Sequence, residues 1–258
     1  MEEQNYKMVA TTMSGLEEIL AEELNTLGAQ NINILNRAVE FVGDLGFMYK
    51  ANLNLRTAIR ILKPIFEFKA RNEKELYRKI YDYNWEQYFG VDETFAIQSS
   101  GFSEVFSHSK YTALKTKDAI ADKFRDNCGK RPNVDVEAPN VQINVHVREN
   151  SFLISLDSSG YSLHKRGYKV ASVDAPINEV LAAGLILLSD WNQISNFHDP
   201  MCGSGTILVE ASMIANNIPA NIFRKRFGFE GWKNFDNELW EKIRDTSLEK
   251  EKEYYGVI

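Results

Sequence analysis

The chain has 258 residues, of which 44% are hydrophobic and 26% charged, as in ordinary folded domains. No apolar run approaches the length of a membrane span, and the acidic, polar N-terminus (residues 1–4, MEEQ) argues against a secretory signal. Cys128 and Cys202 stand far apart, which excludes a disulfide or zinc framework. We therefore expect a cytoplasmic protein in which both thiols are small, buried side chains.

The net charge is −6, but the charges are distributed unevenly. Residues 1–55 carry 3 Lys/Arg and 8 Asp/Glu, residues 56–170 carry 19 and 15, and residues 171–258 carry 8 and 13. A basic middle between acidic flanks can attract phosphate although the total charge is negative. This asymmetry keeps nucleic acid among the possible partners.

The first stretch of the chain predicts the element order β-α-β-β-α-β. A capping box, Ser14-Gly-Leu-Glu17, predicts a helix start, and Gly28 suits the end of that helix. We expect strands at 6–12, 31–35, 38–42 and 59–68, and a second helix at 45–52. This order is typical of a ferredoxin-like half-open sandwich.

A second stretch begins near Ala70 and predicts the order α-β-α-β-β. Helical spacing covers residues 73–83 and 109–128, and Gly129 ends the longer helix. The strands are expected at 94–99, 142–148 and 152–157, the last two forming a hairpin.

A third stretch follows Gly167. Asp174-Ala-Pro176 predicts a helix start, with an acceptor side chain at the cap and proline in the first turn. We expect this helix to reach about Trp191. The remaining expected elements are a strand at 194–198, a helix after 206, a helix at 236–252 and the start of a strand at 254–258.

The segment 199–206 (DPMCGSGT) carries the most chemical information. It follows an apolar strand and opens a helix. Glycines at such a turn let the backbone approach a ligand closely, and the helix start supplies free N–H groups. A turn that binds no ligand is the alternative interpretation.

Other ligand-binding turns fit this segment less well. A Walker P-loop requires lysine where Thr206 stands, and a dinucleotide fingerprint requires glycine where Leu208 stands. Ser204 lacks the frame of a nucleophile elbow. An acidic residue followed by G-x-G suits a ligand with a cationic amino-acid part and no phosphate, such as S-adenosylmethionine.

The same segment resembles motif I of the THUMP-containing guanine-N2 RNA methyltransferases, which are often labelled N6-adenine-specific DNA methylases by similarity. Further stretches resemble the same family: Lys115–Ile120 with Arg131-Pro132, Ser155–Tyr168, Ala175–Ala183 and Phe227–Trp232. The resemblance covers nearly the whole chain.

The resemblance implies an α+β N-terminal region, ferredoxin-like plus THUMP, followed by the start of an α/β Rossmann-like class I methyltransferase domain. The implied domains are residues 1–68 (ferredoxin-like), 69–165 (THUMP, RNA-binding) and 166–258 (the first part of the methyltransferase domain). The cofactor is S-adenosyl-L-methionine. The residues expected at or near it are Asp199, Pro200, Cys202, Gly203, Gly205, Thr206, Lys165, Arg166 and Gly167.

The expected partner is structured RNA. The candidate contacts are Lys110, Lys115, Lys117, Lys123, Arg125, Lys130 and Arg131. A solvated helix face is the alternative, because Asp118, Asp122 and Asp126 are interleaved with them. We expect His108, His146, His164 and His198 to have structural or surface roles rather than to bind metal, and Trp85, Trp191, Trp232 and Trp240 to pack in the core.

The family's catalytic string of Asn or Asp, Pro, Pro and an aromatic residue does not occur in the chain, nor does the acidic residue that closes its second strand. We therefore expect a fragment of a longer protein, without activity of its own. The expected reaction of the longer protein is methylation of a guanine N2 in large-subunit ribosomal RNA. The alternatives are a tRNA guanine-N2 methyltransferase and an RNA-binding module. DNA adenine methylation is least favoured, because a THUMP domain points to RNA.

Overall fold

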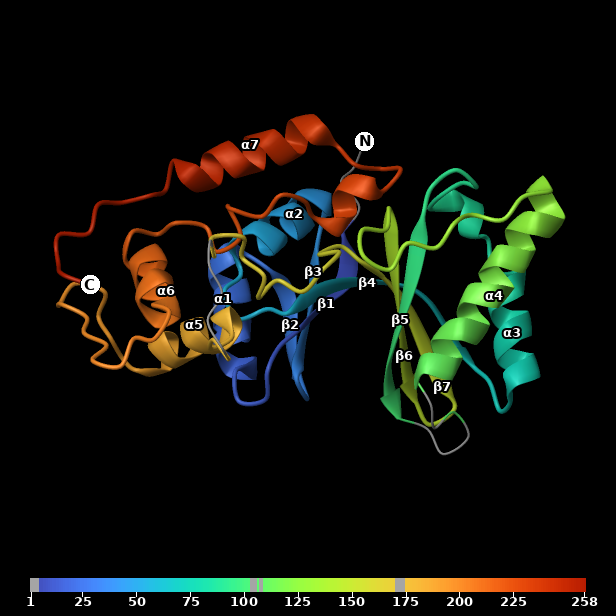
Figure 1. Ribbon diagram of the computed structural model, residues 1–258, viewed down its shortest axis with the longest axis horizontal. Coiled ribbons are helices and arrows are strands. Elements are labelled where there is room, and N and C mark those ends of the chain that lie inside the picture. Colours follow the sequence, from blue (N-terminus) through green and yellow to red (C-terminus); the bar gives the residue numbers. More distant parts are fainter. Residues whose placement is uncertain (1–4, 103–105, 107–108, 170–174) are drawn as a thin grey trace. The chain divides into compact units, whose positions relative to one another are not determined.

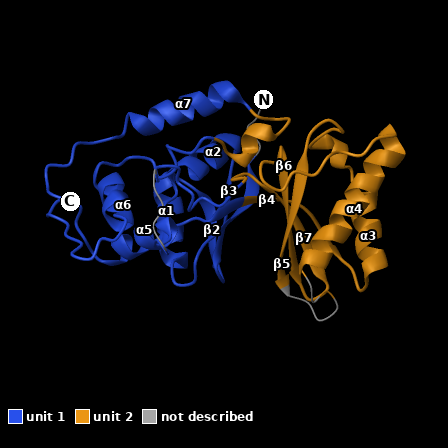
Figure 2. Ribbon diagram, viewed as in Figure 1, with its two compact units in different colours: residues 1–61, 161–225, 236–258 blue, residues 62–160, 226–235 orange. Residues whose placement is uncertain are grey.

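The computed structural model describes residues 5–102, 106, 109–169 and 175–258 (Figure 1). The chain forms two compact units, and each is assembled from separate stretches of sequence (Figure 2). Unit 1 comprises residues 1–61, 161–225 and 236–258, and unit 2 comprises residues 62–160 and 226–235. The N-terminal elements and the segment 199–206 therefore belong to one compact unit.

Unit 1 begins with the predicted β-α-β-β-α order. Strands β1 (Tyr6–Thr11), β2 (Gln30–Leu35) and β3 (Ala38–Gly43) are antiparallel, in the order β2-β3-β1. Helices α1 (Glu17–Leu27) and α2 (Leu45–Asn54) alternate with them, and β4 (Arg60–Lys69) follows. Alternation of buried and exposed residues along β1 turns Met8 and Ala10 into the core, as a strand with one buried face requires. The ferredoxin-like prediction is confirmed.

The predicted capping box at the start of α1 is wrong. Leu16 is the N-cap and its side chain makes no capping bond. The Glu17 carboxylate instead accepts hydrogen bonds from the backbone N–H groups of Gly15 (2.6 Å) and Arg37 (3.0 Å), so it joins the helix start to the β2–β3 turn. Gly28 does end the helix, in the left-handed conformation at φ 98°.

Unit 2 has the predicted α-β-α-β-β order. Helices α3 (Glu73–Asp82) and α4 (Ser109–Cys128) contact each other, and the strands lie in the order β4-β7-β6-β5. The strands after β4 are β5 (Phe95–Phe102), β6 (Val141–Arg148) and β7 (Ser151–Asp157). Only the β5–β6 pair among these neighbours is parallel. Short 3-10 helices lie at Trp85–Gln87 (η1) and Gly228–Gly231 (η2).

An aromatic cluster fills the core of unit 2. The Phe89 ring lies 5.3 Å from that of Phe95 and 5.0 Å from that of Phe124, between ring centroids. Trp85 is fully buried and donates its indole N–H to the Ile80 carbonyl, which satisfies the buried donor.

The other three tryptophans also pack against the protein. Trp232 and Trp240 are buried, and Trp191 is half-buried against an apolar cluster, so the tryptophans do not project into solvent.

The third stretch begins its helix later than predicted. Helix α5 (Glu179–Leu188) is capped by Asn178, whose side chain accepts from the N–H groups of Val180 and Leu181. Pro176 therefore precedes the helix, and Asp174 lies outside the described residues. Helices α6 (Thr206–Ala215) and α7 (Asn237–Leu248) follow, the second ending before residue 252.

The strands predicted at 194–198 and 254–258 are wrong: neither segment forms a regular strand. The Phe197 N–H donates to the Val257 carbonyl (2.9 Å), and the Asn196 side chain accepts from the Val257 N–H (3.0 Å). Parallel strands are stable when neighbours cover both faces, and two short segments joined in this way do not make a sheet. No helix in the described part of the chain is long and apolar enough to span a membrane.

Two glycines of unit 2 allow a matched test of how closely β5 packs against β6. Gly101 and Gly129 both adopt positive φ (92° and 72°), but a Cβ on Gly101 would overlap the Val147 carbonyl of β6, whereas one on Gly129 meets nothing within 4 Å. We expect Gly101→Ala to lower the free energy of unfolding by about 1–3 kcal/mol more than Gly129→Ala. Urea unfolding measures both changes, and equal losses would contradict the close approach of β5 to β6.

Candidate cofactor turn and basic helix

The segment 199–206 forms a compact turn at the start of α6. The Asp199 carboxylate accepts a hydrogen bond from the backbone N–H of Met201 (3.0 Å), and the Gly205 N–H donates to the Cys202 carbonyl (2.7 Å). Gly203 and Gly205 have φ values of 52° and 75°, a backbone conformation that residues with a side chain rarely adopt. We call residues 199–206 the glycine turn.

The space around the glycine turn is open. A Cβ built on Gly203 or Gly205 would meet no other atom within 4 Å, so steric crowding by the protein does not explain the glycines. Pro200 and Cys202 are exposed, Asp199 is half-buried, and Thr206 is buried as the first residue of α6. The first-turn N–H groups of a helix lack intrahelical partners, so the turn presents free donors beside an open surface.

Arg166 lies in the interior rather than on this open surface. Its guanidinium is fully buried, 3.4 Å from the Glu210 carboxylate, and donates to the Leu163 carbonyl (3.0 Å) and the Asn221 side chain (3.1 Å). It also donates to the Arg56 carbonyl. The protein itself therefore supplies the partners of this side chain.

Gly167 and Lys165 flank Arg166. Gly167 has φ 95°, and a Cβ there would overlap the Phe223 carbonyl, so close packing of two backbone segments requires glycine at this position. Lys165 is exposed. The structure thus separates these residues: the glycine turn is open, whereas Arg166 and Gly167 serve packing within unit 1.

The predicted RNA contacts lie on α4 or directly after it, and none is buried. Several already have partners. Arg125 and Arg131 form ion pairs with Asp122, and Lys117 pairs with Asp118 (2.8 Å). The helix is therefore less positive than its lysines and arginines alone indicate.

Aromatic rings hold two more of these cations. Lys115 lies over the Tyr111 ring at 5.6 Å and Lys123 over the Tyr81 ring at 5.1 Å, measured to the ring centroid. Lys110 and Lys130 are exposed. The helix thus presents ammonium groups beside aromatic rings, an arrangement that suits both phosphates and bases.

Asp122 is the acidic centre of this surface. A hydrogen bond from the Tyr77 hydroxyl (2.6 Å), assisted by Arg125 and Arg131, lowers the pKa of Asp122. Burial and the bond to Asp122 raise the pKa of Tyr77 to about 12. The carboxylate therefore stays charged at neutral pH and offsets part of the neighbouring positive charge.

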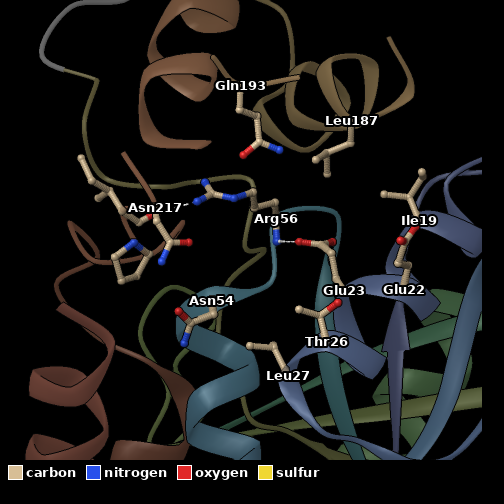
Figure 3. A pocket seen from close by; sticks show the side chains of 12 residues that line it. Ile19, Glu22, Glu23, Thr26, Leu27, Asn54, Arg56, Leu187, Gln193 and Asn217 are labelled. Carbon is tan, nitrogen blue, oxygen red and sulfur yellow. Dashed lines mark hydrogen bonds between the residues drawn. The ribbon is translucent and has the colours of Figure 1, made fainter. Parts of the chain in front are cut away.

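Unit 1 also contains a pocket of about 430 Å³ between α1 and the loops after α5 and α6 (Figure 3). Glu23 and Arg56 lie inside it, and the Arg56 backbone N–H donates to the Glu23 carboxylate (2.7 Å). Its lining residues are Ile19, Glu22, Glu23, Thr26, Leu27, Asn54, Arg56, Leu187, Gln193, Asn217, Ile218 and Pro219. This pocket could not be predicted from the sequence, because neither periodicity nor motif spacing brings these segments together.

The cysteine prediction needs correction, since both thiols are free and exposed. Cys128 ends α4 and Cys202 lies in the glycine turn, where neither side chain has a core to enter. Among the described residues, no group of three or more His, Cys, Asp or Glu side chains is placed to hold a metal ion.

Comparison with known protein families assigns each stretch of the chain. The RlmL ferredoxin-like domain matches residues 7–62, the THUMP domain residues 70–157, and the RMKL-like methyltransferase domain residues 166–257. SMU.472, a protein described as a methyltransferase complexed with SAH, is 32% identical with a TM-score of 0.83, and the match covers 100% of this chain and 67% of that one. The chain belongs to the THUMP-containing, RMKL-like methyltransferase family.

Other members of the family give the same result. The slr0064 protein of Synechocystis sp. strain PCC 6803, whose name describes an RNA methyltransferase, is 40% identical over 244 residues. That match covers 95% of this chain and 64% of the relative. A "predicted N6-adenine-specific DNA methylase" from Listeria monocytogenes is 31% identical with a TM-score of 0.84, covering 96% of this chain and 65% of that one. The chain thus spans about two thirds of the length of these relatives.

Proposed function

We propose that the chain is the RNA-binding and first cofactor-binding part of an S-adenosylmethionine-dependent methyltransferase that modifies a guanine N2 in large-subunit ribosomal RNA. The open glycine turn at the start of α6, in a chain that also carries a THUMP domain, supports this proposal most strongly. The ferredoxin-like match to RlmL favours ribosomal RNA over tRNA. We divide the chain into domains at 1–68, 69–165 and 166–258.

The glycine turn is the proposed cofactor site. Asp199, Gly203 and Gly205 would face the methionine part of S-adenosylmethionine, with Pro200, Cys202 and Thr206 alongside. Asp199 can accept from the cofactor's ammonium group, and the first-turn N–H groups of α6 can bind its carboxylate. When bound, the cofactor would supply an electrophilic methyl group to the guanine amine; its sulfonium would leave as a neutral thioether and the amine would lose a proton.

RNA binding is the proposed role of the basic surface on α4. The cations that would contact phosphates are Lys110, Lys115, Lys117, Lys123, Arg125, Lys130 and Arg131. Of these, Lys117 is paired with Asp118, and Arg125 and Arg131 are paired with Asp122. The absence of disulfides and the distant, exposed cysteines fit a cytosolic setting, which we propose for the protein.

RNA binding by this chain should fall as salt rises, because lysines displace counterions condensed on the RNA. Lys115→Glu with Lys117→Glu should weaken binding to structured RNA by roughly tenfold or more at moderate salt, with a shallower salt dependence. Fluorescence anisotropy across a salt series measures this. The matched control changes Lys250 and Lys252, in the acidic C-terminal stretch, to Glu, and equal affinity of the two double variants would remove α4 from the interface.

Cofactor binding should depend on the open space at Gly203. The chain should bind S-adenosylhomocysteine weakly, and Gly203→Val should abolish that binding because the branched side chain would occupy the ligand's space. Ligand-observed NMR detects weak binding. Gly129→Val is the control, since Gly129 has a similar φ and equally open surroundings on unit 2. Undiminished binding by the Gly203 variant would place the cofactor elsewhere.

The chain alone should transfer no methyl group to undermethylated ribosomal RNA, even with saturating cofactor. Transfer requires the acceptor nitrogen to be held within roughly 3–3.5 Å of the methyl carbon, in line with the sulfur. The Asn/Asp-Pro-Pro-aromatic string that would hold it does not occur in these 258 residues. A tritiated-methyl assay tests this, with slr0064 as the longer comparison protein. Turnover by this chain would show that its catalytic groups lie within residues 1–258.

A further inference from the structure

Unit 1 contains a set of polar and charged side chains, two of them fully buried, that link its N-terminal elements to α6. We call it the junction network, and its members are Glu23, Arg56, Arg166, Tyr168 and Glu210. They come from four segments that other elements separate in the sequence: α1, the segment before β4, the segment after β7, and α6. Such a network forms only in the folded unit.

Glu210 is the acidic member on α6. It is fully buried, and one carboxylate oxygen accepts from Arg166 (3.4 Å) and from the Tyr168 hydroxyl (3.0 Å). Burial, together with the Glu210 charge, raises the pKa of Tyr168, so its hydroxyl stays protonated and donates. Two side chains from one short segment therefore converge on a single point of α6.

Arg56 extends the network to the other end of α6. Its guanidinium donates to the carbonyls of Met213 (3.1 Å) and Ile218 (2.6 Å), and its own carbonyl accepts from Arg166. Glu23 on α1 fixes the backbone of Arg56, as Figure 3 shows. Arg56, from the ferredoxin-like stretch, thus contacts the C-terminal end of α6 directly and reaches Glu210 in the middle of the helix through Arg166.

Not all of the polar groups in this network are satisfied. One Arg56 nitrogen (Nη1) and the second Glu210 oxygen (Oε2) are inaccessible to solvent and have no hydrogen-bond partner. Well-packed apolar side chains often stabilise an interior at least as well as buried charges do. The best-attested benefit of a buried polar network is a single defined geometry, which here would be that of α6.

Glu210 is placed to control the glycine turn through the helix. It lies four residues after Thr206, which is about one turn and about 6 Å along the axis. A bond that fixes the rotation of α6 at Glu210 therefore fixes the direction of the N–H groups in its first turn. Neither Arg166 nor Glu210 reaches the open surface at Gly203 and Gly205, since both side chains are fully buried.

We propose that Arg166 and Glu210 are positioning residues for cofactor binding: their ion pair, held by Arg56 and Tyr168, orients the start of α6. The ferredoxin-like part of the chain, through Arg56, thereby contributes to the geometry of the cofactor turn. This inference rests on the proposed cofactor site at the glycine turn.

The test compares Glu210→Gln with Glu241→Gln in the intact chain. Glu241 forms an exposed ion pair with Arg244 (2.7 Å) on α7 of the same unit, so its variant controls for loss of a carboxylate. Tyr168→Phe removes only one hydroxyl bond to Glu210 and serves if Glu210→Gln does not fold. Each variant is measured where it is fully folded, for amide hydrogen exchange and for binding of S-adenosylhomocysteine and structured RNA.

We expect Glu210→Gln to weaken S-adenosylhomocysteine binding about tenfold and Tyr168→Phe by a smaller factor. Exchange should rise selectively at the hydrogen-bonded amides of α6 from Val209 onward, the first of which donates to the Gly205 carbonyl (2.9 Å), and RNA affinity should not change. Parental cofactor affinity in folded Glu210→Gln, or exchange raised evenly over unit 1, would assign the pair to stability alone and overturn the inference. Failure of the unaltered chain to bind the cofactor would instead count against the proposed cofactor site, while the exchange pattern would still test the orientation of α6.

Discussion

The buried contact between Arg166 and Glu210 is the constraint on which unit 1 depends. Leaving either charge unpaired in the interior would be strongly unfavourable, so the segment after β7, α6 and the segment before β4 must assemble together. This requirement explains why the compact unit combines residues 1–61 with residues 161–225. It also connects a ferredoxin-like fold to helix α6 of the methyltransferase domain through side-chain contacts as well as through the linker.

The two proposed sites use charge in different ways. At the glycine turn the backbone supplies the donors, and Asp199 is the nearby charge. On α4 the cations are side chains, and carboxylates and tyrosines restrain them; Asp122 holds two of them in place. Such restraint lowers the conformational entropy that is lost when a lysine or arginine contacts phosphate. The restraining carboxylates also reduce the net positive charge of the surface. In the proposed RNA-binding role, such a surface would favour structured RNA with a defined shape over non-specific attraction.

Much of the fold was predictable because its signals are local. Alternation in β1 and β7 and the glycine at position 28 predicted the element order of the N-terminal and THUMP regions. The start of α1 was not predictable, because the Glu17 carboxylate accepts a hydrogen bond from the backbone N–H of Arg37. Arg37 lies in the turn after β2, and the sequence pattern does not show that this turn lies beside the start of α1. The role of Arg166 was hidden for the same reason, since its partner Glu210 lies 44 residues away. The segment at 194–198 has the apolar pattern of a strand but lacks the neighbours that would make it one.

The most direct test of the account is mass-spectrometric mapping of modified nucleotides in a strain that lacks the gene. The account predicts loss of one N2-methylguanosine from large-subunit ribosomal RNA, restored when the gene is returned. Loss of an N2-methylguanosine from tRNA, with ribosomal RNA intact, would replace the proposed substrate. Unchanged RNA together with loss of N6-methyladenine from DNA would contradict the account.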